Sequence, residues 1–127
     1  QKGRIPHFFS FIKQHGALLA KGRIAGIQFG ELFTDGLYQR IGKPAMEAAE
    51  QIKAALKKYG YQLSLDTPTN QIFCIVSNEV MKKIAQNVEF GFWEKYDETH
   101  SVIRFATSWA TTMEDTQKLI QILEKNK

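Results

Sequence analysis

One charged residue interrupts an apolar segment near the end of the chain. The segment runs from Ser101 to Trp109 and has the composition of a buried β-strand. Side chains alternate across a strand, so Arg104 shares its face with small residues while Ile103 and Phe105 point to the opposite face. A buried guanidinium must be paired, and its planar fork matches a carboxylate or a phosphate. Two interpretations follow for Arg104: a solvated or structurally paired charge, or an anion-binding residue.

Three further cations lie beside apolar helical sequence near the N-terminus. They are Lys13, Lys21 and Arg23. Glycines recur there at positions 22, 26 and 30, and each costs a helix about 1 kcal/mol relative to alanine. Their regular spacing therefore suggests the close approach of another backbone. The cations form either a solvated helix face or an anion site, for example for a phosphate.

The other reactive side chains form no catalytic or metal-binding pattern. His7, His15 and His100 lack metal-ligand spacing with one another or with Cys74. Cys74 lies between apolar residues in the middle of an expected strand, which is typical of a buried, inert thiol. No glycine-rich phosphate loop follows a strand. We therefore predict no metal site and no catalytic residue in this chain.

Composition limits the class of protein further. The chain has 127 residues, 43% of them hydrophobic, with a net charge of +4 and a pI of about 9.2. The lysines are spread out, so the charge falls short of a nucleic-acid signature. A single cysteine excludes an internal disulfide and fits a reducing cytosol. No apolar segment is long enough to span a membrane and no signal peptide is visible, so we expect a cytoplasmic protein without membrane or nucleic-acid partners.

The expected elements change character halfway along the chain. After a polar lead-in over residues 1–5, helices are expected over residues 7–14, 17–33 and 37–59, the last kinked near Gly42 and Pro44. Strands are expected over residues 61–65, 71–77, 88–96 and 101–109. Short helices are expected over 78–85, capped by Asn78, and from a capping box of Thr111 and Glu114 to about 125. The order predicts an α+β fold: N-terminal helices, then β-β-α-β-β-α, with a small sheet and helices packed on one face.

The N-terminal end suggests that something is missing. The chain begins at Gln1 rather than at methionine, as a piece of a longer protein would, although a trimmed tag or a processed terminus is an alternative. The first helix carries Phe8, Phe9, Phe11 and Ile12, which is more aromatic surface than a short exposed helix tolerates. We therefore expect a partner surface for it, in this chain or outside it.

Several stretches resemble the threonine aldolases, which are pyridoxal-phosphate lyases of the aspartate-aminotransferase fold type. FIKQHGALLAKGR over residues 11–23, the QF at 28–29 and LFTDGLY over 32–38 are similar to the family's segment between the large and small domains. TNQIF over residues 69–73 is similar to its small-domain strand entry. VIRFATSW over residues 102–109, with TT at 111–112 and ED at 114–115, is similar to its arginine strand and closing helix.

The resemblance implies roles for particular residues. Arg104 would hold the α-carboxylate of an amino-acid substrate. Lys13, Lys21 and Arg23 are candidates to lie near the cofactor phosphate or a neighbouring subunit's active site. Residues 1–36 would form the interdomain helical segment, and residues 37–127 one compact α+β small domain of a fold-type I enzyme.

The resemblance also implies what this chain leaves out. In the family, the Schiff-base lysine, the aspartate that pairs with the pyridine nitrogen and the ring-stacking histidine all lie upstream, in the large domain. Lys2-Gly3 does not fit the lysine motif. We therefore expect a C-terminal portion of a pyridoxal 5'-phosphate enzyme that is inactive alone. Its expected partners are the missing N-terminal large domain, the amino-acid substrate and further copies in a dimer or tetramer.

Two alternatives remain open from the sequence. One is another carbon–carbon or β-eliminating lyase of the same superfamily. The other is a non-catalytic α+β binding module, since the second half of the chain resembles small sheet domains that bind RNA. Against the module, we expect the strands to lack the paired exposed aromatics with flanking Lys or Arg that stacking platforms use.

Overall fold

The computed structural model describes residues 5–127. Gln1–Arg4, on which most of the polar lead-in and Lys2-Gly3 fall, lie outside the described residues. The chain divides into two compact units, Gln1–Arg40 and Ile41–Lys127. The predicted boundary between residues 36 and 37 stays a prediction.

The first unit consists of short helical segments without a core. They are α1 (Phe8–Gln14), α2 (Gly22–Phe33), the 3-10 helix η1 (Thr34–Gly36) and α3 (Leu37–Ile41), which reaches the unit boundary. None of these segments has a buried residue. Phe8, Phe9 and Phe11 are about half exposed or more. Within the described chain, α1 therefore finds no surface that covers its aromatic side chains.

The predicted second helix is wrong over its first residues. It begins at Gly22 rather than at residue 17, and the N-cap residue Lys21 has a non-helical φ of −134°. Gly16, between α1 and this helix, takes a left-handed φ of 63°. The expected close packing on the glycines is also not seen. A β-carbon built at Gly26 or Gly30 meets nothing within 4 Å.

The second unit holds a four-stranded sheet and three helices. The helices are α4 (Lys43–Lys58), α5 (Asn78–Ile84) and α6 (Met113–Lys125). The strands are β1 (Gln62–Leu65), β2 (Gln71–Ser77), β3 (Gly91–Lys95) and β4 (His100–Ala106). The predicted interruption of the 37–59 helix falls at Gly42, and Pro44 lies in the first turn of α4, where its missing N–H costs least.

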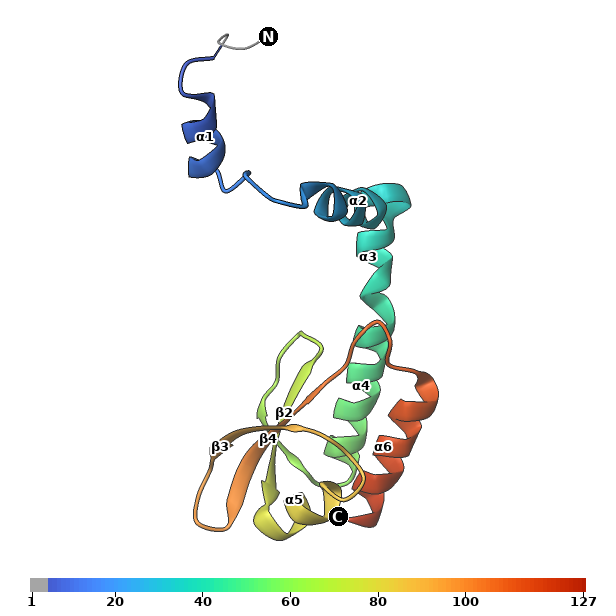
Figure 1. Cartoon of the computed structure of the whole chain (residues 1–127). Coiled ribbons are helices and arrows are strands. Elements are labelled where there is room, and N and C mark those ends of the chain that lie inside the picture. Colours follow the sequence, from blue (N-terminus) through green and yellow to red (C-terminus); the bar gives the residue numbers. More distant parts are fainter. Residues whose placement is uncertain (1–4) are drawn as a thin grey trace. The chain divides into compact units, whose positions relative to one another are not determined.

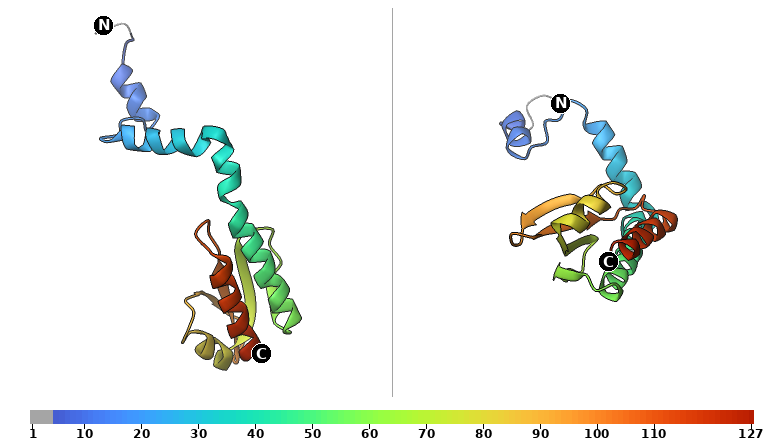
Figure 2. Two further views of the ribbon diagram at one scale, coloured as in Figure 1. Left: turned by 90° about the vertical axis from the view of Figure 1, so that its right-hand side faces the viewer. Right: turned by 90° about the horizontal axis from the view of Figure 1, so that it is seen from below.

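The sheet is antiparallel throughout, in the order β1-β2-β4-β3. Figures 1 and 2 show its ribbon from three directions. β2 and β4 are therefore the central strands, and the apolar composition of β2 on both faces is typical of such a position. α4 and α6 lie side by side over the sheet (Figure 1). This arrangement confirms the predicted α+β class, with a small sheet covered by helices.

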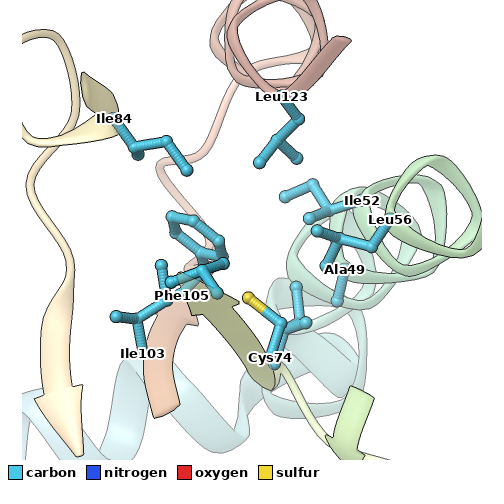
Figure 3. Close-up of a cluster of buried hydrophobic side chains, with 10 residues drawn as sticks. Ala49, Ile52, Leu56, Cys74, Ile84, Ile103, Phe105 and Leu123 are labelled. Carbon is cyan, nitrogen blue, oxygen red and sulfur yellow. The ribbon is translucent and has the colours of Figure 1, made fainter. Parts of the chain in front are cut away.

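The core forms where the two long helices face the central strands (Figure 3). Ile52 and Leu56 of α4 and Leu123 of α6 point toward Cys74 of β2 and Phe105 of β4. Each of these side chains is at most 4% exposed. The helical spacing of the apolar residues in α4 explains this packing, because it places them on one face.

The predicted bounds of the last two strands differ from the structure. β3 begins at Gly91 rather than at residue 88, although Val88 and Phe90 before it pack against the core. Its pairing with β4 shifts register between Phe92 and Glu94, and Phe92 is 61% exposed. β4 ends at Ala106, where the Thr107 hydroxyl turns to donate to the Ala45 carbonyl at 2.6 Å.

The N-cap residues of α5 and α6 each differ by one position from those predicted. Ser77, rather than Asn78, caps α5 by accepting from the Val80 N–H. Thr112, rather than Thr111, caps α6 by accepting from the Asp115 N–H.

Candidate functional site

Arg104 lies in the middle of β4, between two neighbouring strands. Its register partners are Phe73 on β2 and Gly91 on β3. Ile103 and Phe105 point into the core, so alternation places Arg104 on the sheet face away from α4 and α6. A β-carbon at Gly91 would lie 3.3 Å from the Arg104 Nε and 3.4 Å from its Nη2. The Arg104 side chain therefore extends along the space that glycine leaves free.

Neutral groups hold the guanidinium. Its Nη1 donates to the Gln71 Oε1 at 3.3 Å, and its Cζ lies 5.8 Å from the centre of the Trp93 ring. Trp93 in turn packs edge-on against Phe73, with ring centres 5.0 Å apart. Arg104 is partly buried by these neighbours.

The positive charge of Arg104 has no carboxylate partner. Across residues 5–127, no Asp or Glu oxygen lies within 4.0 Å of its guanidinium, although four lysine–carboxylate pairs and one His100–Asp97 contact form there. A guanidinium has five N–H donors, and within the described chain only Nη1 donates to an acceptor. The interpretation of Arg104 as a structural ion pair is therefore not supported.

A hollow of about 270 Å³ opens beside the guanidinium. It is lined by Glu89, Phe90, Gly91, Arg104 and Ala106. The small residues at positions 91 and 106 keep the space next to the Arg104 side chain open, as predicted for Ala106 from its place on the same strand face. The hollow is large enough for a small carboxylate ligand.

A second hollow in this unit, of about 350 Å³, offers less to an anion. Its apolar floor includes Ile52, Phe105 and Leu119, and its rim includes Asp115 and Lys118. The Lys118 ammonium already pairs with Glu114 at 2.7 Å. Arg104 thus remains the stronger candidate for a ligand contact.

The three basic residues singled out in the first unit lie at its surface. Lys13 is in the last turn of α1 and Lys21 is the N-cap residue of α2, and both are exposed. Arg23, in the first turn of α2, follows them in sequence. Within the described residues, none of the three forms a salt bridge. Their predicted role near a cofactor phosphate stays a prediction.

The thiol and the histidine in the second unit have structural surroundings. Burial raises the pKa of the Cys74 thiol to about 12, so this group is protonated and unreactive near neutral pH. The His100 Nδ1 lies 3.2 Å from the Asp97 carboxylate in an exposed turn. The Thr99 N–H donates to that carboxylate and lowers its pKa to about 2. Residues 5–127 contain no cluster of three possible metal ligands.

Sequence reasoning missed three residues of the Arg104 surroundings: Gln71, Gly91 and Trp93. From the sequence, Gln71 belongs to a strand-entry motif and Trp93 has no assigned neighbour. The prediction that the strands lack paired exposed aromatics with flanking Lys or Arg stays a prediction: Trp93 is 54% exposed and meets Phe73 next to Arg104, but Phe73 is partly buried. The register of the sheet produces this grouping.

The fold and the site define an antiparallel α+β domain with a partly buried arginine on one face of its sheet. A solved structure of threonine aldolase from Leishmania major matches 95% of this chain with a TM-score of 0.85 and 30% sequence identity. The chain spans 35% of the length of that protein. The resemblance to the small domain of the threonine aldolase family, predicted from the sequence, is confirmed.

A second solved structure shares the fold alone. Serine palmitoyltransferase from Sphingomonas wittichii matches 68% of this chain and 24% of its own, with a TM-score of 0.57 and 10% identity. No family model and no curated protein matches the sequence. None of the helices in residues 5–127 has the length and apolar character needed to cross a membrane.

Proposed function

We propose that this chain is the C-terminal small domain of a threonine aldolase-like lyase that uses pyridoxal 5'-phosphate. The intact enzyme would cleave a β-hydroxy-α-amino acid, such as threonine or allo-threonine, to glycine and an aldehyde. The likeness to the Leishmania major threonine aldolase over nearly the whole chain supports the family. One observation carries the role of this domain: Arg104 is partly buried, yet its charge has no carboxylate partner within residues 5–127.

Arg104 would bind the α-carboxylate of the substrate. Two parallel N–H donors of a guanidinium match the two oxygens of a carboxylate, which fixes orientation as well as position. Such fixing holds the substrate so that the bond to be broken is aligned for reaction. The cofactor, when bound, supplies the electron-withdrawing ring that stabilises the developing carbanion.

The described residues fit the substrate rather than the covalent attachment of the cofactor. No lysine lines the hollow beside Arg104. The one buried lysine among residues 5–127, Lys53, already donates to Glu50 at 2.9 Å and to the Thr67 carbonyl at 2.6 Å. We therefore propose that a large domain supplies the lysine and that this chain is inactive alone.

The remaining parts of the proposal concern assembly. Lys13, Lys21 and Arg23 would lie near the cofactor phosphate or in a neighbouring subunit's active site. A dimer or tetramer would bring such a neighbour into place. The cytoplasm is the proposed location, because the single cysteine is a free, buried thiol.

Aldehyde release tests the proposal. With pyridoxal phosphate and threonine, we expect the product of the complete reading frame to release acetaldehyde and the 127-residue chain to release none. In the longer protein, Arg104→Lys should lower kcat/KM roughly 10- to 100-fold, because it loses a charge-assisted bidentate contact. Arg40→Lys, at an arginine outside the hollow, is the matched control. Turnover by the isolated chain, or full activity of Arg104→Lys, would contradict the proposal.

Another lyase of the same superfamily is the nearest alternative. Assaying the longer protein against threonine, allo-threonine, tryptophan and tyrosine separates the two. Aldehyde release from the hydroxy amino acids supports an aldolase. Release of indole or phenol supports a β-eliminating lyase.

The aromatic pair beside Arg104 favours a second candidate function, a nucleic-acid-binding module. Trp93 is 54% exposed and lies next to a cation, as in surfaces that stack bases. Titrating single-stranded RNA while following tryptophan fluorescence tests it. Salt-dependent quenching that is lost in Trp93→Ala but kept in Trp109→Ala would support the module.

A further inference from the structure

The nitrogens of the Arg104 guanidinium differ in their hydrogen bonding. Nη1 is occupied by the Gln71 side chain. Nε and Nη2 form the side-on edge, and neither donates to an acceptor within residues 5–127. This edge is the one that binds a carboxylate with two parallel N–H donors.

We propose that Gln71 and Trp93 are positioning residues, which hold Arg104 so that its Nε–Nη2 edge faces a carboxylate ligand. Gly91 keeps that edge clear. The inference rests on the proposed function, in which the ligand is the α-carboxylate of an amino acid.

Gln71 suits this role because its amide oxygen accepts a hydrogen bond without carrying charge. The register pairs Gln71 with Ala106 and Phe73 with Arg104, so Gln71 lies diagonally across from the arginine on the same sheet face. A glutamate there would also accept from Nη1, but it would neutralise the guanidinium. The neutral amide therefore fixes the side chain while leaving its charge for the ligand.

Trp93 restrains the guanidinium differently. Its ring centre lies 5.8 Å from Cζ, within the range of a cation–π contact. The edge-on contact with Phe73 holds the ring itself. These two restraints, one at Nη1 and one at the ring, limit rotation of the guanidinium about its terminal bonds.

Gly91 leaves room beside the Arg104 side chain. A β-carbon there would come within 3.3–3.4 Å of Nε and Nη2, the two atoms of the free edge. At that spacing the Arg104 side chain would have to shift by a few tenths of an ångström. Glycine at this register position thus keeps the carboxylate-binding edge open.

Nitrogen-15 NMR of the Arg104 Nε–Hε group in the 127-residue chain tests the inference, with Arg104→Lys used to assign the signal. Without ligand, we expect Gln71→Ala and Trp93→Ala each to increase the mobility of this group. In acetate titrations, Gln71→Ala should weaken binding about tenfold. Gln71→Glu should abolish the acetate response while the backbone spectrum and Tm stay intact, because the new carboxylate occupies the guanidinium.

The control is Gln117→Glu, which adds the same charge to an exposed glutamine on α6. It should change neither mobility nor acetate binding. Unchanged mobility of the Arg104 Nε–Hε group in both Gln71→Ala and Trp93→Ala would overturn the positioning role, regardless of the result of the acetate titrations. Increased mobility in those variants with no acetate response in the wild type would leave the positioning intact and contradict the proposed function instead.

Discussion

Replacing Arg104 with methionine separates a ligand-binding arginine from a structural one. Methionine keeps an unbranched apolar stem along Gly91 and removes only the guanidinium. The substitution therefore deletes the hydrogen bond to the neutral Gln71 and the cation–π interaction with Trp93. The free energy of unfolding should respond only to these two interactions.

The expected loss of stability is small. The 3.3 Å hydrogen bond contributes about 1 kcal/mol. The cation–π interaction with a half-exposed ring adds about 0.5–1 kcal/mol, giving a loss of about 1.5–2 kcal/mol. Removing one partner of a buried ion pair would instead cost about 3–5 kcal/mol, because a charge would be left uncompensated.

Urea unfolding followed by far-ultraviolet circular dichroism measures the difference. Leu56→Ala is the matched control in the core, where a fully buried leucine should cost about 2–5 kcal/mol. A loss of about 3 kcal/mol or more for Arg104→Met would refute the reasoning. Such a loss would show that Arg104 stabilises the fold and does not serve mainly to bind a ligand.

Three further outcomes are expected. Thr112→Ala removes the cap of α6, which accepts from the Asp115 N–H, and should lower the free energy of unfolding by about 0.5–2 kcal/mol in urea, whereas Thr112→Ser should not. Burial raises the pKa of Cys74 from 9.0 to about 12, so stability should fall as pH rises from about 9 toward 12, and less so in Cys74→Ala; equal slopes in the two proteins would contradict this. The Thr99 N–H lowers the pKa of Asp97 from 3.8 to about 2, so its stabilisation is present above about pH 4 and is lost as pH falls toward 2; thermal melts of Asp97→Asn should depend less on pH in that range.

The sequence could predict the elements whose patterns are local. β2 was predicted over residues 71–77, and the structure has it there because its apolar side chains face both sides of a central position. The end of α6 at Lys125 was also predicted closely. The start of α2 was not, because Leu18 and Leu19 extend the apolar helical pattern of the sequence although the helix begins only at Gly22.

The sequence predicted the central residue of the candidate site, Arg104, but not the residues that surround it. Arg104 was identifiable because a charge in an apolar strand requires a partner. Gln71, Gly91 and Trp93 are far from it in sequence or on another strand, and only the order β2-β4-β3 brings them together. The bulge beside Trp93 is also a property of the paired strands, so alternation along one strand could not place that ring.

The central claim is that the Arg104 guanidinium receives the carboxylate of an amino acid. The most direct measurement is a pair of NMR titrations of the 127-residue chain, one with L-threonine and one with L-threoninamide, which lacks the carboxylate. We predict a saturable shift of the Arg104 Nε–Hε signal with L-threonine and none with the amide. Equal responses to both compounds, or no response to L-threonine at any concentration up to its solubility limit, would contradict the account.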